Sequence, residues 1–272
     1  MADVKHSLPK AGEDRTRDRI DVAPRFTQAD VIRLNNLFRG QDAAEVVASV
    51  IGAGLLGETA IVSSFGAESA VLLHLVAQAA PDMPVLFLDT GKHFPETLAY
   101  RDELAAKLKL NIVNLAPDAE ELAKKDATEL RWSYDPDGCC EIRKVKPLEK
   151  ALADFDTSIT GRKGFQSSTR QGLARFELDG TTGRLKFNPL ANWTREQLDE
   201  YFEAHDLPRH PLEAEGYPSI GCSPCTSKVK PGEDPRSGRW RGWDKTECGI
   251  HGPAEGPGGD EGELPPGYEP AF

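Results

Sequence analysis

Short apolar runs alternate with helical segments through the middle of the chain. The apolar runs have the length of strands, and the segments between them repeat apolar residues at the spacing of an amphipathic helix. We predict strands at residues 59–63, 85–88, 111–115 and 157–160, and helices at residues 68–79, 96–108, 119–127 and 140–155. This alternation predicts an α/β fold with a mostly parallel sheet and helices on both faces. Since right-handed crossovers place the strand-to-helix turns along one edge of such a sheet, we expect a ligand there.

The N-terminal part of the chain has a different pattern. Residues 1–25 are polar and charged and lack apolar periodicity, which predicts a disordered segment. A helix is expected to start near Thr27, whose hydroxyl can form a cap with Asp30. A second helix is expected at residues 43–51.

The C-terminal part also departs from the alternation. Two short strands are expected near Phe176 and at residues 185–187, followed by a helix that Thr194 can cap. From residue 205 onward Gly and Pro dominate, which predicts loops that a metal could hold in place. Residues 252–272 are rich in Gly, Pro and Glu and are expected to form a flexible acidic tail.

The length of 272 residues suits one full core with extensions, so we expect one domain at residues 26–251. The chain has no run of eighteen apolar residues and no apolar segment near its N-terminus. These features give no support to membrane insertion or secretion, and a cytoplasmic protein is expected.

The net charge of −11 argues against general nucleic-acid binding, which depends on massed Lys and Arg. The charge is uneven, because cations crowd the stretch before Cys248. These cations are Lys228, Lys230, Arg236, Arg239, Arg241 and Lys245. A small anionic substrate fits this pattern better than a polyanion, although solvated surface charge is the better interpretation for any one of these cations taken alone.

The five cysteines form two pairs and one single residue. Cys139 and Cys140 are adjacent, and two residues separate Cys222 from Cys225. In a reducing compartment these four thiols can bind tetrahedral zinc or a 4Fe-4S cluster, since both accept four sulfurs. Adjacent ligands are unusual for structural zinc. A disulfide between Cys139 and Cys140 is the alternative, and it leaves the second pair unexplained.

Cys248 has no remaining cysteine to pair with. It lies in the polar run Glu247-Cys248-Gly249-Ile250-His251, just after the cations. Positive charge stabilises a thiolate, so Cys248 is a candidate nucleophile. The alternatives are a buried apolar thiol for Cys248 and an ordinary surface histidine for His251.

Two cations follow the first cysteine pair at helical spacing. Arg143 comes four residues after Cys139, and Lys144 comes four residues after Cys140. On a helix each cation would stack one turn from its cysteine and could face both the metal and a bound anion. An exposed helix face beside Glu141 is the alternative interpretation.

Two turns at the expected sheet edge have residues suited to a nucleotide. The turn at residues 63–69, Ser-Ser-Phe-Gly-Ala-Glu-Ser, joins a strand to a helix, where backbone N–H groups and the helix N-terminus can receive a phosphate. The turn Leu88-Asp89-Thr90-Gly91 offers an acceptor, a hydroxyl and a flexible glycine. Each pattern alone also fits an ordinary turn, and the two together favour a nucleotide.

With these residues in view, the sequence resembles the assimilatory adenylyl-sulfate reductases of the thioredoxin-dependent, iron-sulfur type. These enzymes are related to the 3′-phosphoadenylyl-sulfate reductases. The resemblance runs from residue 59 to residue 251 and includes both turns, the basic loop from Thr160 to Arg170, both cysteine pairs and the motif around Cys248. It implies the adenine-nucleotide alpha-hydrolase-like fold. The first turn departs from the Ser-Gly-Gly-x-Asp-Ser pattern of the related ATP pyrophosphatases, which speaks against ATP cleavage.

The resemblance implies reduction of adenylyl sulfate to sulfite and AMP, in sulfate assimilation and cysteine biosynthesis. In that chemistry the thiolate of Cys248 attacks the sulfate sulfur and AMP leaves, which gives an enzyme S-sulfocysteine. Reduced thioredoxin or a similar dithiol then attacks the Cys248 sulfur and releases sulfite. The thiol must be external because the other four cysteines hold the 4Fe-4S cluster. The cluster is expected to position Lys144 and to tune the field around the sulfate rather than to pass electrons.

The resemblance also assigns residues to roles. The sulfate-binding cations are expected to be Lys144, Arg236, Arg239 and His251. Each such contact is expected to lower the barrier by about 2 to 4 kcal/mol. The expected metal ligands are Cys139, Cys140, Cys222 and Cys225. The expected substrate-binding residues are Ser63, Ser64, Phe65, Gly66, Leu88, Asp89, Thr90, Gly91, Gly161 and Arg162.

Three other functions stay open at this stage. One is reduction of the 3′-phosphorylated substrate, or of both substrates. Enzymes restricted to the 3′-phosphorylated substrate generally lack the four-cysteine set, so its presence favours adenylyl sulfate. Another is a zinc-stabilised nucleotide-binding protein without turnover. A nucleic-acid sulfurtransferase is disfavoured by the acidic charge. A homo-oligomer is also compatible with the sequence.

Overall fold

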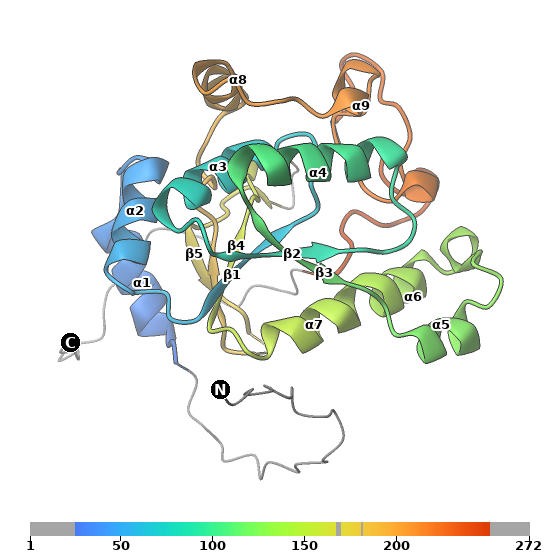
Figure 1. The fold of residues 1–272 in the computed structure, drawn as a ribbon, viewed down its shortest axis with the longest axis horizontal. Helices are drawn as coiled ribbons and strands as arrows, with labels where there is room; N and C mark the ends of the chain where they lie inside the picture. Colours follow the sequence, from blue (N-terminus) through green and yellow to red (C-terminus); the bar gives the residue numbers. More distant parts are fainter. Residues whose placement is uncertain (1–24, 167–169, 181, 251–272) are drawn as a thin grey trace, which may run out of the picture.

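The computed structural model describes residues 25–166, 170–180 and 182–250, which build a six-stranded sheet with helices on both faces (Figure 1). The strands follow the order β3-β2-β1-β4-β6-β5, and every pair is parallel except β5 with β6. This topology confirms the predicted α/β fold with a mostly parallel sheet. The strands are β1 (Thr59–Ser63), β2 (Pro84–Leu88), β3 (Asn111–Leu115), β4 (Thr157–Thr160), β5 (Phe176–Leu178) and β6 (Leu185–Phe187).

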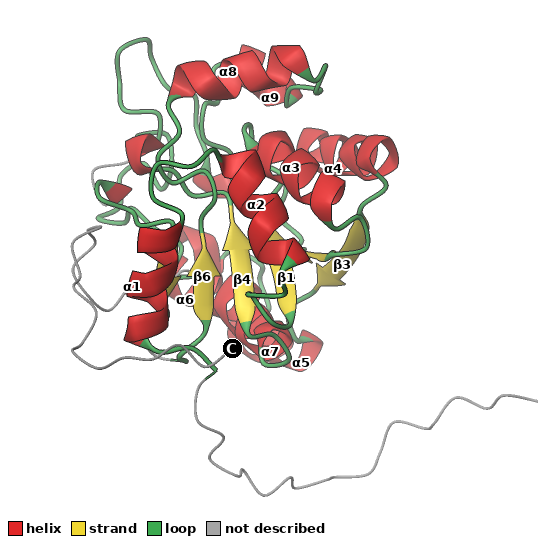
Figure 2. Cartoon of the chain, turned by 90° about the vertical axis from the view of Figure 1, so that its left-hand side faces the viewer, coloured by secondary structure: helices red, strands yellow, loops and turns green. Residues whose placement is uncertain are grey.

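Helices α3 and α4 cover one face of the sheet, and α5 to α7 lie on the other (Figure 1). Helices α8 and α9 pack against α3 and α4, and they form a further layer away from the sheet (Figure 2). The α-helices are α1 (Gln28–Leu37), α2 (Ala43–Gly52), α3 (Ser69–Ala79), α4 (Pro95–Leu108), α5 (Ala119–Lys125), α6 (Pro136–Cys140), α7 (Lys146–Leu152), α8 (Arg195–Ala204) and α9 (Pro211–Ala214). Shorter helical turns are η1 (Arg131–Ser133), η2 (Glu141–Val145), η3 (Gly164–Gln166) and η5 (Ser223–Cys225).

Alternate residues of the central strands pack into two separate cores. Because successive side chains of a strand point to opposite faces, a strand buried on both sides, such as β2, contributes apolar residues to both cores. The larger core, shared with α1 to α4, contains Ile61, Val85, Phe87 and Ile159. The smaller core, shared with α7, contains Ala60, Leu86, Leu88, Leu148 and Leu152.

Two helices begin where the sequence predicts, and the reason is local. The Thr27 hydroxyl accepts from the Asp30 N–H at 3.3 Å, and the Asp30 carboxylate accepts from the Thr27 N–H at 2.9 Å. Thr194 and Gln197 form the same reciprocal capping box at the start of α8. Both capping boxes supply hydrogen-bond acceptors for backbone N–H groups that have no partner within the first helical turn.

The helix predicted at residues 140–155 has the wrong bounds. One continuous helical segment runs through α6, η2 and α7, from Pro136 to Leu152. It starts early because the Asp135 side chain accepts from the Gly138 N–H at 2.8 Å and Pro136 suits the first helical position. Its middle part, directly after Cys140, is a π-helix, a distortion that often occurs at functional sites.

The helix predicted at residues 119–127 is also too long, since α5 ends at Lys125. The next residue, Asp126, turns its carboxylate to Arg143 at 2.7 Å, and this long-range ion pair takes the chain out of the helix. In the C-terminal part, the expected loops are present but include the short elements α9 and η5.

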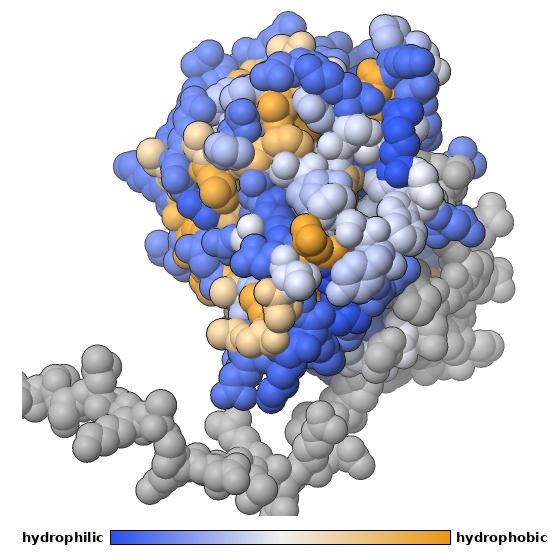
Figure 3. All heavy atoms as spheres, turned by 90° about the vertical axis from the view of Figure 1, so that its right-hand side faces the viewer, coloured by the Kyte–Doolittle hydropathy of each residue, from blue (hydrophilic) through white to orange (hydrophobic). Residues whose placement is uncertain are grey.

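The predicted segments at the chain ends lie almost wholly outside the described residues, which begin at Arg25 and end at Ile250. Within the described part, no helix combines the length and apolar character needed to cross a membrane. The face that includes α5, α6 and α9 is mostly hydrophilic, with apolar residues in small separate groups (Figure 3).

Candidate functional site

A cavity of about 200 Å³ opens at the carboxyl ends of β1, β2 and β4. Residues within two positions of the ends of these strands form part of its wall, including Ser64 after β1, Thr90 after β2 and Gly161 after β4. The order β2-β1-β4 places a topological switch point at β1, because the chain leaves it toward β2 and returns on the opposite side as β4. The cavity therefore lies at the sheet edge where the sequence predicts a ligand.

The turn after β1 folds around its own polar groups. The Ser63 hydroxyl accepts from the Phe65 N–H at 3.2 Å, and the Ser69 hydroxyl donates to the Gly66 carbonyl at 2.7 Å. Phe65 takes a positive φ of 50°, and its side chain packs edge-on against Phe87 in the core. The sequence groups Phe65 with the substrate-binding residues, but its side chain supports the turn from behind and does not line the cavity.

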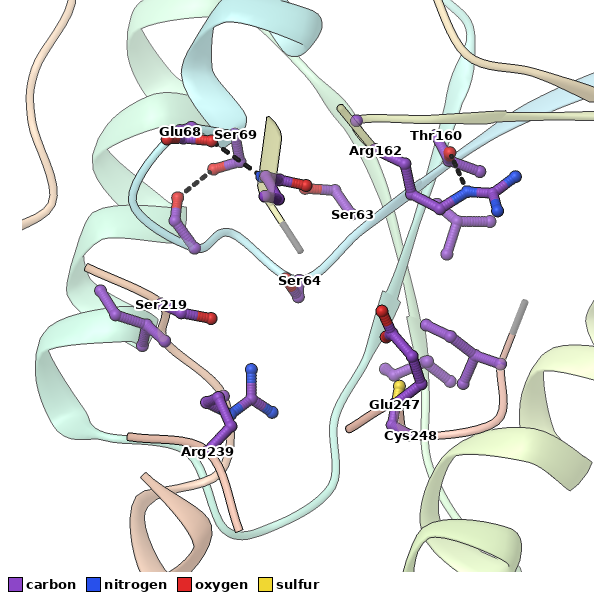
Figure 4. Close-up of a pocket in the computed structure, with 18 of the residues that line it drawn as sticks. Ser63, Ser64, Glu68, Ser69, Thr160, Arg162, Ser219, Arg239, Glu247 and Cys248 are labelled. Atoms are coloured by element: carbon purple, nitrogen blue, oxygen red, sulfur yellow. Dashed lines mark hydrogen bonds between the residues drawn. The ribbon is translucent and has the colours of Figure 1, made fainter. Parts of the chain in front are cut away.

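Glu68 places a carboxylate at the wall of the cavity, at the N-terminus of α3 (Figure 4). The carboxylate accepts from Lys163 Nζ and from Gln166 Nε2, both at 2.8 Å, and Arg195 lies 3.4 Å away. Burial raises the pKa of Glu68, but the charges and hydrogen bonds of Lys163, Arg195 and Gln166 together outweigh burial and the net pKa is lowered. Glu68 is therefore ionised, and it neutralises the buried Lys163.

The turn after β2 has two kinds of residue. Leu88 and Thr90 line the cavity, whereas Asp89 and Gly91 hold the shape of the turn. The Asp89 carboxylate accepts from the Gly91 N–H at 3.1 Å, and Gly91 takes a φ of 67° that other residues rarely adopt. Of the four residues predicted here, two thus contact the cavity and two support it.

His93 is a wall residue that the sequence analysis did not single out. Its Nε2 lies 2.8 Å from the Leu88 carbonyl, so this nitrogen carries the proton and donates. Burial lowers the pKa of His93, which keeps the ring neutral. The neutral ring braces the end of β2 beside the cavity.

Arg162 lines the cavity after β4, with its charge already paired. The guanidinium binds the carboxylate of Glu177 and donates from Nε to the Thr160 hydroxyl at 3.3 Å. Burial lowers its pKa despite the neighbouring carboxylate. Arg162 therefore shapes this wall more than it adds net positive charge.

Lys144, Arg236 and Arg239 all line the cavity. Within the described ranges, neither Lys144 nor Arg239 has a carboxylate at ion-pair distance. Arg239 lies over the Trp240 ring, with its guanidinium carbon 4.5 Å from the centroid, and extends into the cavity (Figure 4). Burial lowers the pKa of Lys144, but the neighbouring thiols, that of Cys222 foremost, raise it overall. These two cations give the cavity uncompensated positive charge.

Cys248 is half-buried and lines the same cavity. Figure 4 shows its sulfur and the carboxylate of Glu247 on one side of the cavity, facing Arg239 on the other. Glu247 accepts from Arg170 Nε at 2.9 Å and from Arg236 Nη2 at 3.1 Å. His251, the fourth predicted cation, lies outside the described residues.

The four paired cysteines line a second, small chamber next to this cavity. Cys139 and Cys140 end α6, and Cys222 and Cys225 come from the turn at η5. All of them are free thiols, so the alternative disulfide between Cys139 and Cys140 is not formed.

The chamber offers four sulfur donors, from Cys139, Cys140, Cys222 and Cys225. Across the described residues, no group of three or more Cys, His, Asp or Glu side chains closes on one ion position. A tetrahedral zinc ion holds its sulfurs at about 2.3 Å and so draws them together, whereas a 4Fe-4S cluster binds each thiolate at a separate corner. Both groups accept four sulfur donors, so the donor set of the chamber fits a 4Fe-4S cluster as well as it fits zinc.

The cavity and the chamber share a wall made of Lys144, Cys222 and Trp240. Lys144 thus faces both spaces, whereas Arg143 lines only the chamber. The Arg143 guanidinium is buried against Asp126 and donates to the Thr90 carbonyl at 2.7 Å. The expectation that both cations could face an anion is therefore wrong for Arg143, which holds the wall together.

Several wall residues escaped the sequence analysis. Lys163 and Gln166 fall in the basic loop, and Trp240 lies among the cations. Glu68 and Glu247 stand inside motifs that were recognised, yet neither was assigned a role. The signal for Glu68 and Glu247 was an acidic residue beside an expected anion site. Several buried cations in one cavity repel each other, and a nearby carboxylate reduces this repulsion.

Comparison with known proteins gives consistent matches. Residues 58–228 match the phosphoadenosine phosphosulfate reductase domain family. An adenosine 5′-phosphosulfate reductase of Mesorhizobium japonicum is 54% identical over 195 residues, which cover 71% of this chain and 76% of the relative. A phosphoadenosine 5′-phosphosulfate reductase of Gloeobacter violaceus is 45% identical over 195 residues, covering 70% and 81%.

Among solved structures, the fold is similar to phosphoadenylyl-sulfate reductase from Candida auris in a phosphate complex. The TM-score is 0.64 at 26% sequence identity, and the match covers 75% of this chain and 98% of that one.

Proposed function

Because the chain belongs to the phosphoadenosine phosphosulfate reductase family, we propose that it reduces adenylyl sulfate to sulfite and AMP. One observation carries this choice of substrate and chemistry. A cavity with a fifth, unpaired cysteine shares a wall with a chamber of four cysteines, and Lys144 stands in that wall. This arrangement supports thiol chemistry on an anion beside a sulfur-ligated cofactor.

The cavity suits a nucleotide that carries two adjacent anionic groups. The turns after β1, β2 and β4 line the nucleotide side with Ser64, Gly66 and Leu88. Lys144 and Arg239 offer positive charge to an anion bound beside Cys248. Preorganised cations in a partly dehydrated site offset the repulsion between a thiolate and an anionic sulfate, at about 2 to 4 kcal/mol for each good contact.

In the first step, the thiolate of Cys248 attacks the sulfate sulfur. A bond forms between Cys248 Sγ and that sulfur, and the bond from the sulfur to the AMP phosphate oxygen breaks. AMP leaves with the electron pair as a stable anion, so little acid catalysis is needed. The enzyme is left with an S-sulfocysteine at position 248.

In the second step, a thiolate of reduced thioredoxin or a similar dithiol attacks Cys248 Sγ. Sulfite leaves with the electron pair of the bond between the two sulfurs. The second thiol of the donor then resolves the mixed disulfide, which returns the Cys248 thiolate and leaves the donor oxidised. The donor supplies both electrons, and it must be external if the other four cysteines are ligands.

We further propose that Cys139, Cys140, Cys222 and Cys225 hold a 4Fe-4S cluster. When bound, the cluster fixes the four sulfurs as thiolates and contributes its charge to the field in the shared wall. Lys144 orients its ammonium between these sulfurs and the substrate anion. A reducing compartment would keep all five thiols available, which supports the cytoplasm as the location.

The 3′-phosphorylated substrate is the second candidate. It is favoured by the 45% identity to the Gloeobacter violaceus protein, whose name states that substrate. Adenylyl sulfate remains the first choice because the relative from Mesorhizobium japonicum, at 54% identity, is named for that substrate. The four-cysteine set, which enzymes restricted to the 3′-phosphorylated substrate generally lack, also favours it.

The test is anaerobic incubation of the purified protein with adenylyl sulfate, followed by intact-mass and peptide analysis. We expect one SO₃ adduct on the Cys248 peptide, and we expect reduced thioredoxin to remove it. Cys248→Ser is the control and should form none. An adduct that persists in this variant, or its absence from the wild type, would refute the proposal. A parallel incubation with the 3′-phosphorylated substrate decides between the two candidates.

A further inference from the structure

Cys248 is held from both sides by its neighbours in the chain. Glu247 precedes it and turns toward the cavity, whereas Ile250 follows and packs into the smaller core. Gly249 between them has a φ of 86°, a left-handed conformation that lets the chain reverse direction. The segment that carries the sulfur, residues 246–250, is therefore attached at a polar point and at an apolar point.

The polar attachment is a carboxylate shared by two arginines. Arg170 binds Glu247 in a two-pronged pair, with Nε to Oε1 at 2.9 Å and Nη2 to Oε2 at 3.0 Å. Arg236 Nη2 donates to Glu247 Oε2 at 3.1 Å and to the Thr246 carbonyl at 2.8 Å. The arginine side chains are only 11% and 15% exposed, so solvent screens these bonds little.

The polar attachment continues to the nucleotide side of the cavity. Arg170 Nη1 donates to Gln166 Oε1 at 2.6 Å, and Gln166 Nε2 donates to Glu68 at 2.8 Å. One chain of hydrogen bonds therefore connects the N-terminus of α3 with Glu247. The position of Cys248 is thus tied to the wall that receives the nucleotide.

The apolar attachment comes from Ile250. Its side chain packs against the core between the sheet and α7, next to Val62 and Leu148. This contact lies on the opposite side of Gly249 from the arginines. The two attachments together fix the direction in which the Cys248 side chain leaves the backbone.

We propose that Glu247 and Ile250 are positioning residues that hold the sulfur of Cys248 at the cavity during sulfur transfer. The inference rests on the proposed function, because it assigns these residues to the first step of that reaction. Nucleophilic attack needs the reacting atoms about 3 to 3.5 Å apart with the correct alignment, and a loosely attached segment reaches this geometry rarely. Because two arginines share one carboxylate, the group keeps net positive charge, and Glu247 can stay in place while the anion binds.

The experiment compares Glu247→Gln with wild type in the cluster-loaded protein. Single-turnover formation of the Cys248 adduct gives the rate at saturating adenylyl sulfate, and calorimetry in a Cys248→Ser background gives the substrate Kd. We expect the rate to fall by about tenfold to a hundredfold, as for loss of a hydrogen bond to a charged group, while Kd changes by less than about threefold. Glu120→Gln, an exposed carboxylate on α5 paired with Lys124, is the matched control and should behave as wild type.

A second pair of measurements tests the position of the sulfur itself. Iodoacetamide should alkylate Cys248 faster in Glu247→Gln and in Ile250→Ala, because the released segment exposes the thiol. Glu247→Asp, which keeps the charge, should recover part of the rate. Tighter substrate binding in Glu247→Gln would instead make Glu247 a competitor of the substrate and would overturn the proposal, as would an unchanged rate.

The outcomes separate this inference from the function on which it rests. If wild type forms no adduct, the proposed function fails. If wild type forms the adduct and Glu247→Gln forms it at the same rate, only the positioning role fails.

Discussion

The hydroxyl oxygen of Thr90 lies 3.3 Å from the sulfur of Cys222, across the wall that separates the cavity from the cysteine chamber. Thr90 is 1% exposed, and its hydroxyl also accepts from the Lys92 N–H at 3.2 Å. The turn after β2, which borders the nucleotide side, is therefore bonded directly to one of the four clustered thiols. A change in that turn should therefore alter the position of the Cys222 thiol in the chamber.

Replacement of Thr90 by Val keeps the shape of the side chain and removes its hydroxyl. The variant leaves the Lys92 N–H without its acceptor, so we expect the free energy of unfolding to fall by about 1 to 3 kcal/mol. Urea unfolding of the cluster-loaded protein measures this loss. Thr90→Ser, which keeps the hydroxyl, should lose less, and equal stability of the Val variant and wild type would contradict the bond.

Replacement of Gly221 by Ala should displace Arg239 without harming the fold. A Cβ at position 221 would clash with the Arg239 guanidinium, which is the far end of a flexible side chain and can move away. We expect KM for adenylyl sulfate to rise by about tenfold, as for loss of one ionic contact, with Tm nearly unchanged. Gly52→Ala is the control, since a Cβ there meets no atom within 4 Å. A KM equal to that of wild type would show that Arg239 does not contact the substrate.

An iron-sulfur protein purified without oxygen is brown, and replacement of Cys140 by Ser should remove this expected colour and the activity together. Cys140 is one of four sulfurs that line the chamber, and an alcohol is a poor ligand for iron. Visible absorption, iron content and adduct formation, measured after anaerobic purification, test this expectation. Full activity in the colourless variant would contradict the role of the cluster, and a colourless wild-type protein that contains zinc would contradict its identity.

His210 should make stability depend on pH. Burial lowers the pKa of His210 to about 4, and the neutral ring contacts the Thr97 hydroxyl through Nε2 at 3.0 Å and accepts from the Leu212 N–H at 3.2 Å. In the unfolded chain a histidine takes up a proton below about pH 6.5, whereas the folded protein resists protonation until about pH 4. The unfolded state therefore binds more protons in this window, and stability is full above it and falls as pH falls through it.

The loss attributable to His210 should reach about 3 kcal/mol at the acid end of the window. Urea unfolding at several pH values measures it in wild type and in His210→Gln, whose side chain is neutral throughout. The slope should be smaller in the variant. Identical slopes in the two proteins would show that His210 titrates normally in the folded state.

Much of the fold could be predicted because the responsible forces act locally. Strands at residues 59–63, 111–115 and 157–160 are confirmed to the residue, because each is a short run rich in β-branched or apolar residues between two helical segments. The capping pairs at Thr27 and Thr194 also follow from residues three positions apart. The segment at Cys139 and Cys140 was placed less well, because the Asp-Pro signal before it went unused and the π-helix depends on packing of the cysteines and cations.

The sequence by itself determined the fold class, the family resemblance, and the division of five cysteines into two pairs and one single residue. These depend on residue type and spacing, which are fixed along the chain. Only the tertiary structure decided which cations remain available to an anion. Glu68 pairs with Lys163, which is 95 positions away in the sequence, and Glu247 pairs with Arg170, which is 77 positions away. Lys144 and Arg239 also line the cavity but form no such ion pair among the described residues. Electrostatic energy depends on separation in space and on burial, and neither can be read from distance along the chain.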